Sequence, residues 1–323
     1  MRANRKGAAS MLVRRAAASA ADIMLTFAAV TLLSFLLMRA SPIDPAEAFA
    51  IRNSLAPSVE TIAELRTAMG LDGPLLKQYG AWLSKAARLD FGRSLVTNKP
   101  VLDEFAVTIP FTLRIVALSA VMQALGAIAL GYLGYRLKER WSGLVVRAIA
   151  IAGVSVPGFY LATAYLDIIA VKLQWIAIAG NRGLLRDWHP ALILAIPMAA
   201  FYGRLLTGIL AKEMEEDYVV YARCQGLSEG YILFRHALPH ALLAMLPNFM
   251  QSVGFAVAGA TIIERIFSVP GIGNLIVTSV INRDAPMIHF SILLLAAVFM
   301  LTNRMSDAAR AWLNRDAARR GEG

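Results

Sequence analysis

Cysteine and charge are both scarce in this chain of 323 residues. The single cysteine, Cys224, excludes an intramolecular disulfide and any metal cluster built on several cysteines. Charged residues make up only 17% of the sequence, whereas hydrophobic residues make up 58%. A soluble domain of this length needs more charge to cover its surface, so much of the surface must face lipid.

The sequence also lacks the common signatures of enzymes. It contains no Gly-Lys dipeptide, which excludes a Walker A phosphate loop, and none of its four histidines begins a His-Glu-x-x-His pair. A constellation of catalytic Cys and His is absent as well. We therefore predict that the chain is not an enzyme, and we expect neither a cofactor nor a metal site.

Long hydrophobic runs are what the sequence has instead. Six of them are long enough to cross about 30 Å of hydrocarbon, and each must be helical because its backbone has no water to bond. The first run is too long for the hydrophobic part of a cleavable signal. The predicted fold class is an all-α membrane protein with six transmembrane helices, at about 17–38, 110–134, 146–168, 190–210, 242–263 and 287–303, the fourth and sixth short or interrupted.

The net charge of +10 is better explained by membrane topology than by nucleic-acid binding, because Lys and Arg accumulate on cytoplasmic loops. With both termini inside, seventeen Lys and Arg lie in the inner segments and five lie in the two short outer loops. We therefore predict a multi-pass protein with cytoplasmic segments at 1–16 and 304–323, and no nucleic-acid partner.

The segment 41–105 is predicted to fold outside the membrane. Ser58 is placed to cap a helix that Gly70 ends, and Leu75–Leu89 carries its apolar residues largely on one side. We expect a helical external cap between the first two spans, with 106–303 forming the core transmembrane domain.

A second polar segment, 211–241, lies on the predicted inner side between the fourth and fifth spans. Glu213–Gln225 is expected to form a short amphipathic helix that Gly226 ends, and a second helix should run from about Ser228 to Pro239. Two such helices would form a rigid projection on the membrane face. By periodicity alone, an ordinary amphipathic hairpin on the membrane surface is the alternative.

The residues of this segment resemble the coupling loop of ABC importer permeases, specifically of the dipeptide/oligopeptide/nickel branch. Asp217-Tyr218-Val219-Val220-Tyr221-Ala222-Arg223, then Gly226-Leu227 and Arg235-His236-Ala237-Leu238, follow the pattern of that branch, although Gln225 replaces its common Lys. Similar matches at 41–45, 70–94 and 264–273 extend the resemblance over roughly residues 10–316.

The resemblance implies a permease subunit in a bacterial inner membrane, with ATP hydrolysis left to partner subunits. It implies three kinds of partner: a homologous second permease in a heterodimer, two ABC ATPase subunits and a periplasmic substrate-binding protein. The substrate would be nickel, a metal chelate or a di- or oligopeptide. The residues that would couple the permease to the ATPase are Asp217, Tyr221, Ala222, Arg223, Gly226, Leu238 and Pro239.

A stand-alone secondary transporter or channel is the alternative function. It should show inverted repeats or buried charged relays, and the two halves of this sequence show neither. A membrane-embedded enzyme comes third, because no catalytic constellation is present.

Polar residues within the fifth predicted span mark a candidate translocation path. Asn248, Gln251, Ser252 and Phe255 share one helical face. They either line the path or join neighbouring helices, and the sequence leaves both open. Neutral side chains of this kind suit a peptide or a chelated metal better than a bare ion, which needs ligands that replace its water.

Other intramembrane polar residues and glycines are expected to be structural. Asp167 should be paired or reach the surface, and Arg204 should be structural. The residues expected to allow close helix packing are Gly126, Gly131, Gly134, Gly254 and Gly259.

Overall fold

The computed structural model describes residues 21–320 except 38, 40–43, 54–57 and 176–183. The described residues are helical apart from turns and one isolated bridge between Arg93 and Pro100. They form two compact units, one within 1–106 and 278–300 and the other within 107–277 and 301–323. The all-α fold class is confirmed.

Four helices among the described residues are long and apolar enough to cross a membrane. They are α5 (Val101–Arg136), α8 (Leu184–Glu213), the continuous helix Glu229–Ile266 that contains α11 (Leu238–Ile266), and α13 (Ala285–Arg320). The second, fourth, fifth and sixth predicted spans lie within them. The expectation that the fourth and sixth would be short or interrupted was wrong, since Pro190 and Pro197 lie inside an unbroken α8. Neighbouring helices can satisfy the backbone groups that proline frees.

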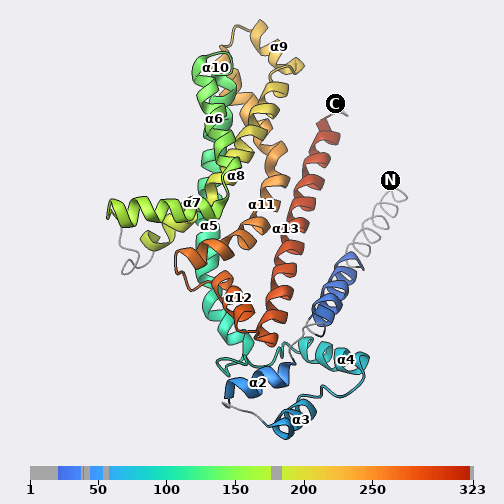
Figure 1. The fold of residues 1–323 in the computed structure, drawn as a ribbon. Coiled ribbons are helices and arrows are strands. Elements are labelled where there is room, and N and C mark those ends of the chain that lie inside the picture. The colour runs from blue at the N-terminus through green and yellow to red at the C-terminus, as the bar shows by residue number, and fades with distance from the viewer. Residues whose placement is uncertain (1–20, 38, 40–43, 54–57, 176–183, 321–323) are drawn as a thin grey trace, which may run out of the picture. The chain divides into compact units, whose positions relative to one another are not determined.

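The third predicted span is not one straight helix. It comprises α6 (Trp141–Ser155) and α7 (Gly158–Tyr165), which continues as the π-helix η1 (Leu166–Lys172), and the two parts are bent by 100°. Val156 has an extended conformation, with φ −85° and ψ 123°, because the following Pro157 disfavours the helical region for the residue before it. Figure 1 shows α7 running across the direction of α6. The predicted continuous span over 146–168 is thus corrected to a broken one. If the bent pair is counted as one span, the described residues contain up to five candidate spans.

The first predicted span is described from residue 21 as the apolar helix Ala21–Leu37, which is shorter than the membrane-crossing helices, and residues 17–20 lie outside the described part. The arrangement of six spans is therefore supported only in part.

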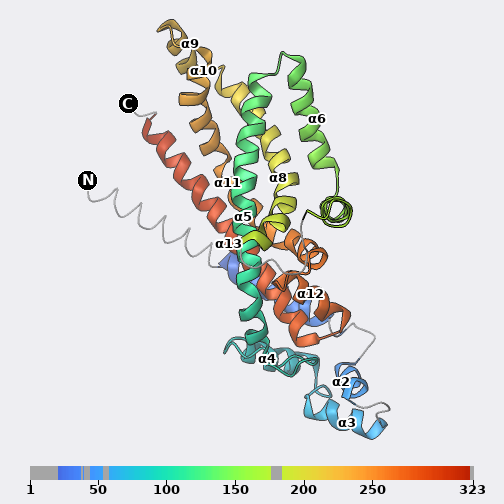
Figure 2. The same cartoon turned by 90° about the vertical axis from the view of Figure 1, so that its left-hand side faces the viewer.

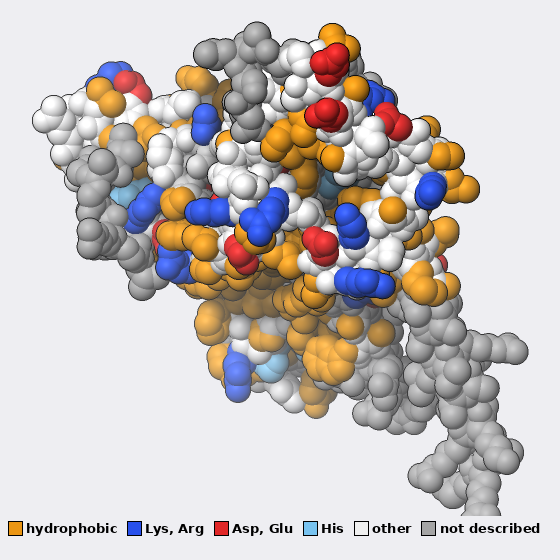
Figure 3. Space-filling view, turned by 90° about the horizontal axis from the view of Figure 1, so that it is seen from below, with side chains coloured by type: hydrophobic (Ala, Val, Ile, Leu, Met, Phe, Trp, Pro, Cys, Tyr) orange, Lys and Arg blue, Asp and Glu red, His pale blue; other side chains and the backbone are white. Residues whose placement is uncertain are grey.

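Three short helices follow in the segment predicted as the cap: α2 (Pro45–Asn53), α3 (Val59–Ala68) and α4 (Leu75–Ala86). As predicted, the Ser58 hydroxyl accepts a hydrogen bond from the Thr61 N–H, and Gly70 follows α3 with φ +68°. Seen from below Figure 1, Lys, Arg, Asp and Glu side chains lie scattered among hydrophobic ones on this end (Figure 3).

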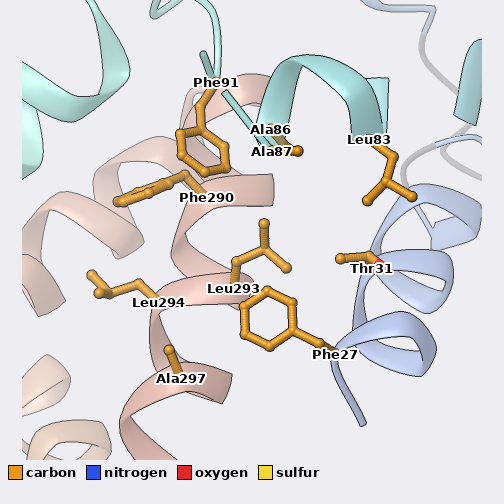
Figure 4. A pocket seen from close by; sticks show the side chains of 10 residues that line it. All are labelled: Phe27, Thr31, Leu83, Ala86, Ala87, Phe91, Phe290, Leu293, Leu294 and Ala297. Carbon is orange, nitrogen blue, oxygen red and sulfur yellow. The ribbon is translucent and has the colours of Figure 1, made fainter. Parts of the chain in front are cut away.

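Side-chain contacts fix α4 within its unit. The hydroxyls of Thr31 and Tyr79 are 2.9 Å apart, and the Trp82 ring lies 5.3 Å from the ring of His289 on α13. Between helix Ala21–Leu37, α4 and α13 an apolar cavity of about 360 Å³ remains, into which Phe27, Leu83 and Leu293 project (Figure 4). Of these three side chains, Leu293 is only 5% exposed, whereas Phe27 and Leu83 are 37% and 40% exposed at the cavity.

Small residues allow the helices of the second unit to approach closely. A Cβ on Gly126 would lie 2.9 Å from the Ala199 Cβ, and one on Gly131 would lie 2.6 Å from the Leu206 Cβ. Gly134 and Gly259 are similarly close to α8, as the sequence predicted. Helix α8 also packs against both α6 and α11 (Figure 2).

Candidate functional site

Two short helices form a hairpin where α8 ends. α8 ends at Glu213, the chain turns through 214–216, and α9 covers Asp217–Cys224. Glu216 is extended, with φ −69° and ψ 150°, so the first helix begins at Asp217 rather than at Glu213 as predicted. Gly226 has φ +80° and ends it as predicted, and the Ser228 hydroxyl caps α10 (Glu229–Ile232).

The second helix does not end near Pro239, as the sequence suggested. α10 passes through the π-helical turn η2 (Leu233–Ala237) directly into α11. Proline lacks an N–H and its ring clashes with the carbonyl four residues earlier. The wider π turn just before Pro239 accommodates both effects, so α10 and α11 form one continuous helix over Glu229–Ile266.

Apolar packing fixes the base of the hairpin on α8. Val219 of α9 and Ile232 of α10 are fully buried in one cluster with Leu206 and Leu210 of α8. The Tyr218 hydroxyl donates a 3.0 Å hydrogen bond to Glu213 Oε2, and burial raises the pKa of Tyr218. A hairpin held in this way moves with α8 and α11 rather than independently of them.

The predicted coupling residues divide into an outward and an inward set. Asp217, Tyr221 and Pro239 are exposed, Tyr221 by 67%. Ala222 and Leu238 are only 7% and 6% exposed and belong to the cluster against α8. These two buried residues can support the hairpin from inside. Only the exposed residues can contact a partner directly.

Arg223 is also exposed, and it joins the two helices of the hairpin. Its Nε donates a 2.6 Å hydrogen bond to Glu229 Oε1, which raises the pKa of the Arg223 guanidinium. Such an exposed ion pair contributes little to the stability of the whole protein. It connects α9 to α10 across the turn that contains Gly226.

The polar face of α11 is also divided. Ser252 is buried and accepts a 2.8 Å hydrogen bond from Gln123 Nε2 of α5, which matches the helix-joining alternative. Asn248 instead lines a cavity of about 600 Å³ together with Glu213, His240, Arg310 and Asn314. Gln251 is half-buried and Phe255 is 51% exposed. Of the four residues, Asn248 thus has the position most suited to contact with a polar solute.

Sequence reasoning missed the most constrained polar cluster of this unit. The buried Glu264, at the end of α11, accepts hydrogen bonds from Thr112 Oγ1 at 2.5 Å, Gly273 N at 2.7 Å and Asn274 N at 3.2 Å. The Thr112 hydroxyl in turn accepts from Ile272 N at 2.8 Å. These bonds, here called the Glu264 clasp, fix the start of α12 (Ile272–Ile281) against α5 and α11. The sequence offered one signal for this cluster, which is the position of Glu264 as a single acidic residue at the end of an apolar run.

The remaining polar residues have local partners. Asp167 Oδ2 lies 2.7 Å from Lys172 Nζ, so the expected pairing is confirmed. His189 contacts the Tyr165 hydroxyl and His289 the Ser34 hydroxyl. Within the described ranges, no three His, Cys, Asp or Glu side chains gather where they could hold a metal ion.

Comparison with known proteins identifies the family to which the chain is similar. Residues 123–319 match the family described as "Binding-protein-dependent transport system inner membrane component", and residues 9–116 match the N-terminal region of such membrane components. The chain is 32% identical over 304 residues to a putative peptide transport system permease protein of Brucella suis, covering 92% of this chain and 95% of that one. It is also 32% identical over 285 residues to the glutathione transport system permease protein GsiC of Escherichia coli strain K12, covering 88% and 92% of the two chains.

Proposed function

This chain belongs to the family of inner-membrane permeases of binding-protein-dependent ABC importers, and we propose that it carries a di- or oligopeptide or a glutathione-like peptide into the cytoplasm. The family predicted from the coupling segment is confirmed, and ATP hydrolysis belongs to ATPase partners. The names of the two relatives favour a peptide and give no specific support to nickel.

The observation that carries the proposal is the continuity between the hairpin and the polar face of α11. Asn248 lies on the helix Glu229–Ile266, and the exposed Tyr221 lies on the separate helix α9. Val219 and Ala222 of α9 belong to the same apolar cluster as Leu238 and Met245 of α11, so α9 is packed onto the start of that helix. A partner that displaces the hairpin therefore displaces the helix that contacts the solute. Coupling of this kind needs one rigid element with two positions, which a packed helix pair supplies. We propose that two ATPase subunits bind the hairpins of this chain and of a homologous second permease.

The proposed orientation puts both termini and the hairpin in the cytoplasm and the segment 41–105 outside. Cys224 lies exposed on α9, so the natural chain carries its own reporter. In intact spheroplasts, we expect a membrane-impermeant maleimide to leave Cys224 unlabelled until the membrane is permeabilised. A Cys224→Ser chain carrying Asn98→Cys should label without permeabilisation, because Asn98 is exposed in the proposed external segment. Labelling of Cys224 in intact spheroplasts would reverse the proposed topology.

Neutral polar groups in the path suit a peptide, whose charges need hydrogen-bonding partners but no strong ligand. In ATP-loaded proteoliposomes containing the complete importer, we expect Asn248→Leu with Gln251→Leu to lower peptide uptake by more than tenfold. This corresponds to at least about 1.4 kcal/mol of lost interaction. Protein abundance should stay unchanged, because neither side chain is fully buried.

The double variant His189→Gln with His289→Gln is the matched control. Glutamine can keep a hydrogen bond to the Tyr165 and Ser34 hydroxyls, so uptake should fall by less than tenfold. Uptake of chelator-free Ni²⁺ by the natural chain that disappears in this histidine variant would contradict the peptide assignment and indicate a bare-ion path.

A further inference from the structure

A second polar cavity lies where the helix α5 ends. It has a volume of about 380 Å³ and is lined by the turn that joins α5 to α6 and by residues of the hairpin. The end of α5 contributes Tyr135 and Arg136, and the turn contributes Lys138, Glu139 and Arg140. The hairpin contributes Arg223 and Glu229, and η2 contributes Leu233.

Cations outnumber acids in this cavity. Arg223 and Glu229 neutralise each other through their ion pair. The end of α5 and the turn then supply three cations, Arg136, Lys138 and Arg140, against the single carboxylate of Glu139. Lys138 Nζ lies 4.8 Å from the centre of the Tyr135 ring, and no ion pair connects Arg136 or Arg140 to another residue of the described ranges. The cavity therefore has an uncompensated positive charge that suits an anion.

The geometry directs this charge into the cavity. Arg136 reaches toward α10, since its Nη2 atom lies 3.9 Å from the position of a Cβ on Gly230. Arg140 precedes the first residue of α6, and its side chain does not cap that helix. The positive end of the α6 dipole thus adds to the charge of the guanidinium groups. A phosphate between Arg136 and Arg140 could accept charge-assisted hydrogen bonds from both.

The surroundings place this anion site at the depth of lipid headgroups. The apolar stretch of α5 ends at Arg136, and Trp141, which is 79% exposed, begins the apolar helix α6. Tryptophan side chains are enriched at membrane–water interfaces. One turn further along α6, Leu144 and Val145 are 63% and 46% exposed, so apolar surface continues from the cavity along the helix. An acyl chain can cover that surface, whereas a soluble phosphate cannot.

We propose that this cavity binds the phosphate of an anionic phospholipid, such as phosphatidylglycerol or cardiolipin, whose acyl chain lies along α6. The lipid phosphate contacts Arg136 and Arg140 beside the Arg223–Glu229 pair. Basic pockets between membrane helices bind such headgroups elsewhere. The proposed lipid site requires only that the chain lies in the membrane as described. It does not depend on the proposed coupling role of the hairpin.

The test compares two double variants of the full-length chain, both in the assembled importer and in the permease pair without ATPase subunits. Arg136→Gln with Arg140→Gln removes the cavity cations, and Arg147→Gln with Arg235→Gln removes two exposed cations outside the cavity. Binding of phosphatidylglycerol and of phosphatidylcholine is measured by native mass spectrometry after delipidation, with inorganic phosphate added in a parallel series.

We expect the natural chain and the Arg147/Arg235 variant to retain phosphatidylglycerol in preference to phosphatidylcholine. The Arg136/Arg140 variant should bind phosphatidylglycerol at least tenfold more weakly, which corresponds to about 1.4 kcal/mol. Equal binding by the two variants would overturn the site, and so would full displacement of the lipid by inorganic phosphate. If lipid binds the permeases but is excluded once the ATPase subunits are present, the cavity is a protein contact and the proposal fails.

Discussion

Gly226→Val should abolish substrate-stimulated ATP hydrolysis by the assembled importer while leaving the permease in the membrane at its normal abundance. Gly226 has φ +80°, where a β-branched residue is strongly disfavoured. A Cβ at this position would meet nothing within 4 Å, so the cost is one of backbone conformation and not of a clash. Relief of that strain would change the turn between α9 and α10 and break the ion pair that spans it.

Gly226→Asn is the matched control for this prediction, because asparagine visits the left-handed region more readily than other residues with side chains. It should keep most of the stimulated hydrolysis. The rate of ATP hydrolysis is measured in proteoliposomes with and without loaded binding protein, and membrane abundance is followed by immunoblot. Normal uptake by the Gly226→Val importer would show that this hairpin is not the coupling element.

Gly273→Ala should prevent stable assembly of the permease. A Cβ on Gly273 would lie 2.2 Å from the Thr261 Cα and 2.8 Å from the Thr261 nitrogen, both backbone atoms that cannot rotate away. The substitution would push α12 away from α11 and break the hydrogen bond from Gly273 N to Glu264. Gly208→Ala is the matched control, since a Cβ there meets nothing within 4 Å and alanine favours the helix.

Removal of the carboxylate tests the same Glu264 clasp from its other side. Glu264→Leu would leave a hydroxyl and two backbone N–H groups without their acceptor, and each unsatisfied buried group costs about 1–3 kcal/mol. Glu264→Gln keeps an acceptor oxygen and should be intermediate. The midpoint of thermal unfolding is measured by fluorescence-detected size-exclusion chromatography. If Glu264→Leu and Gly273→Ala both melt at the temperature of the natural protein, the Glu264 clasp does not hold the fold.

The features that local sequence specifies were predictable. A hydroxyl residue before a helix, as at Ser58, and a glycine after one, as at Gly70 and Gly226, fix helix ends within a few residues. Hydropathy located four long helices for the same reason, because length and apolar content are local properties. The prediction of the third span was wrong because hydropathy reports how many apolar residues follow one another and not the direction of the helix axis. The bend at Pro157 was therefore not predicted.

The features that depend on distant partners could not be read from the chain. Glu264 lay within a familiar motif, but its partner Thr112 is 152 positions away. Likewise, Ser252 bonds to Gln123, 129 positions earlier, whereas Asn248 lies beside a cavity. Which side chains line a path depends on which faces the neighbouring helices cover, and the sequence of one helix does not contain that information.

Peptide uptake by proteoliposomes that contain the complete importer tests the central claim most directly. With ATP inside and peptide-loaded binding protein outside, labelled peptide should accumulate against its gradient, and hydrolysis should rise with uptake. Omission of ATP, of the binding protein or of this chain should each stop accumulation. Accumulation by this chain alone, without ATPase subunits, would contradict the assignment and identify a stand-alone transporter.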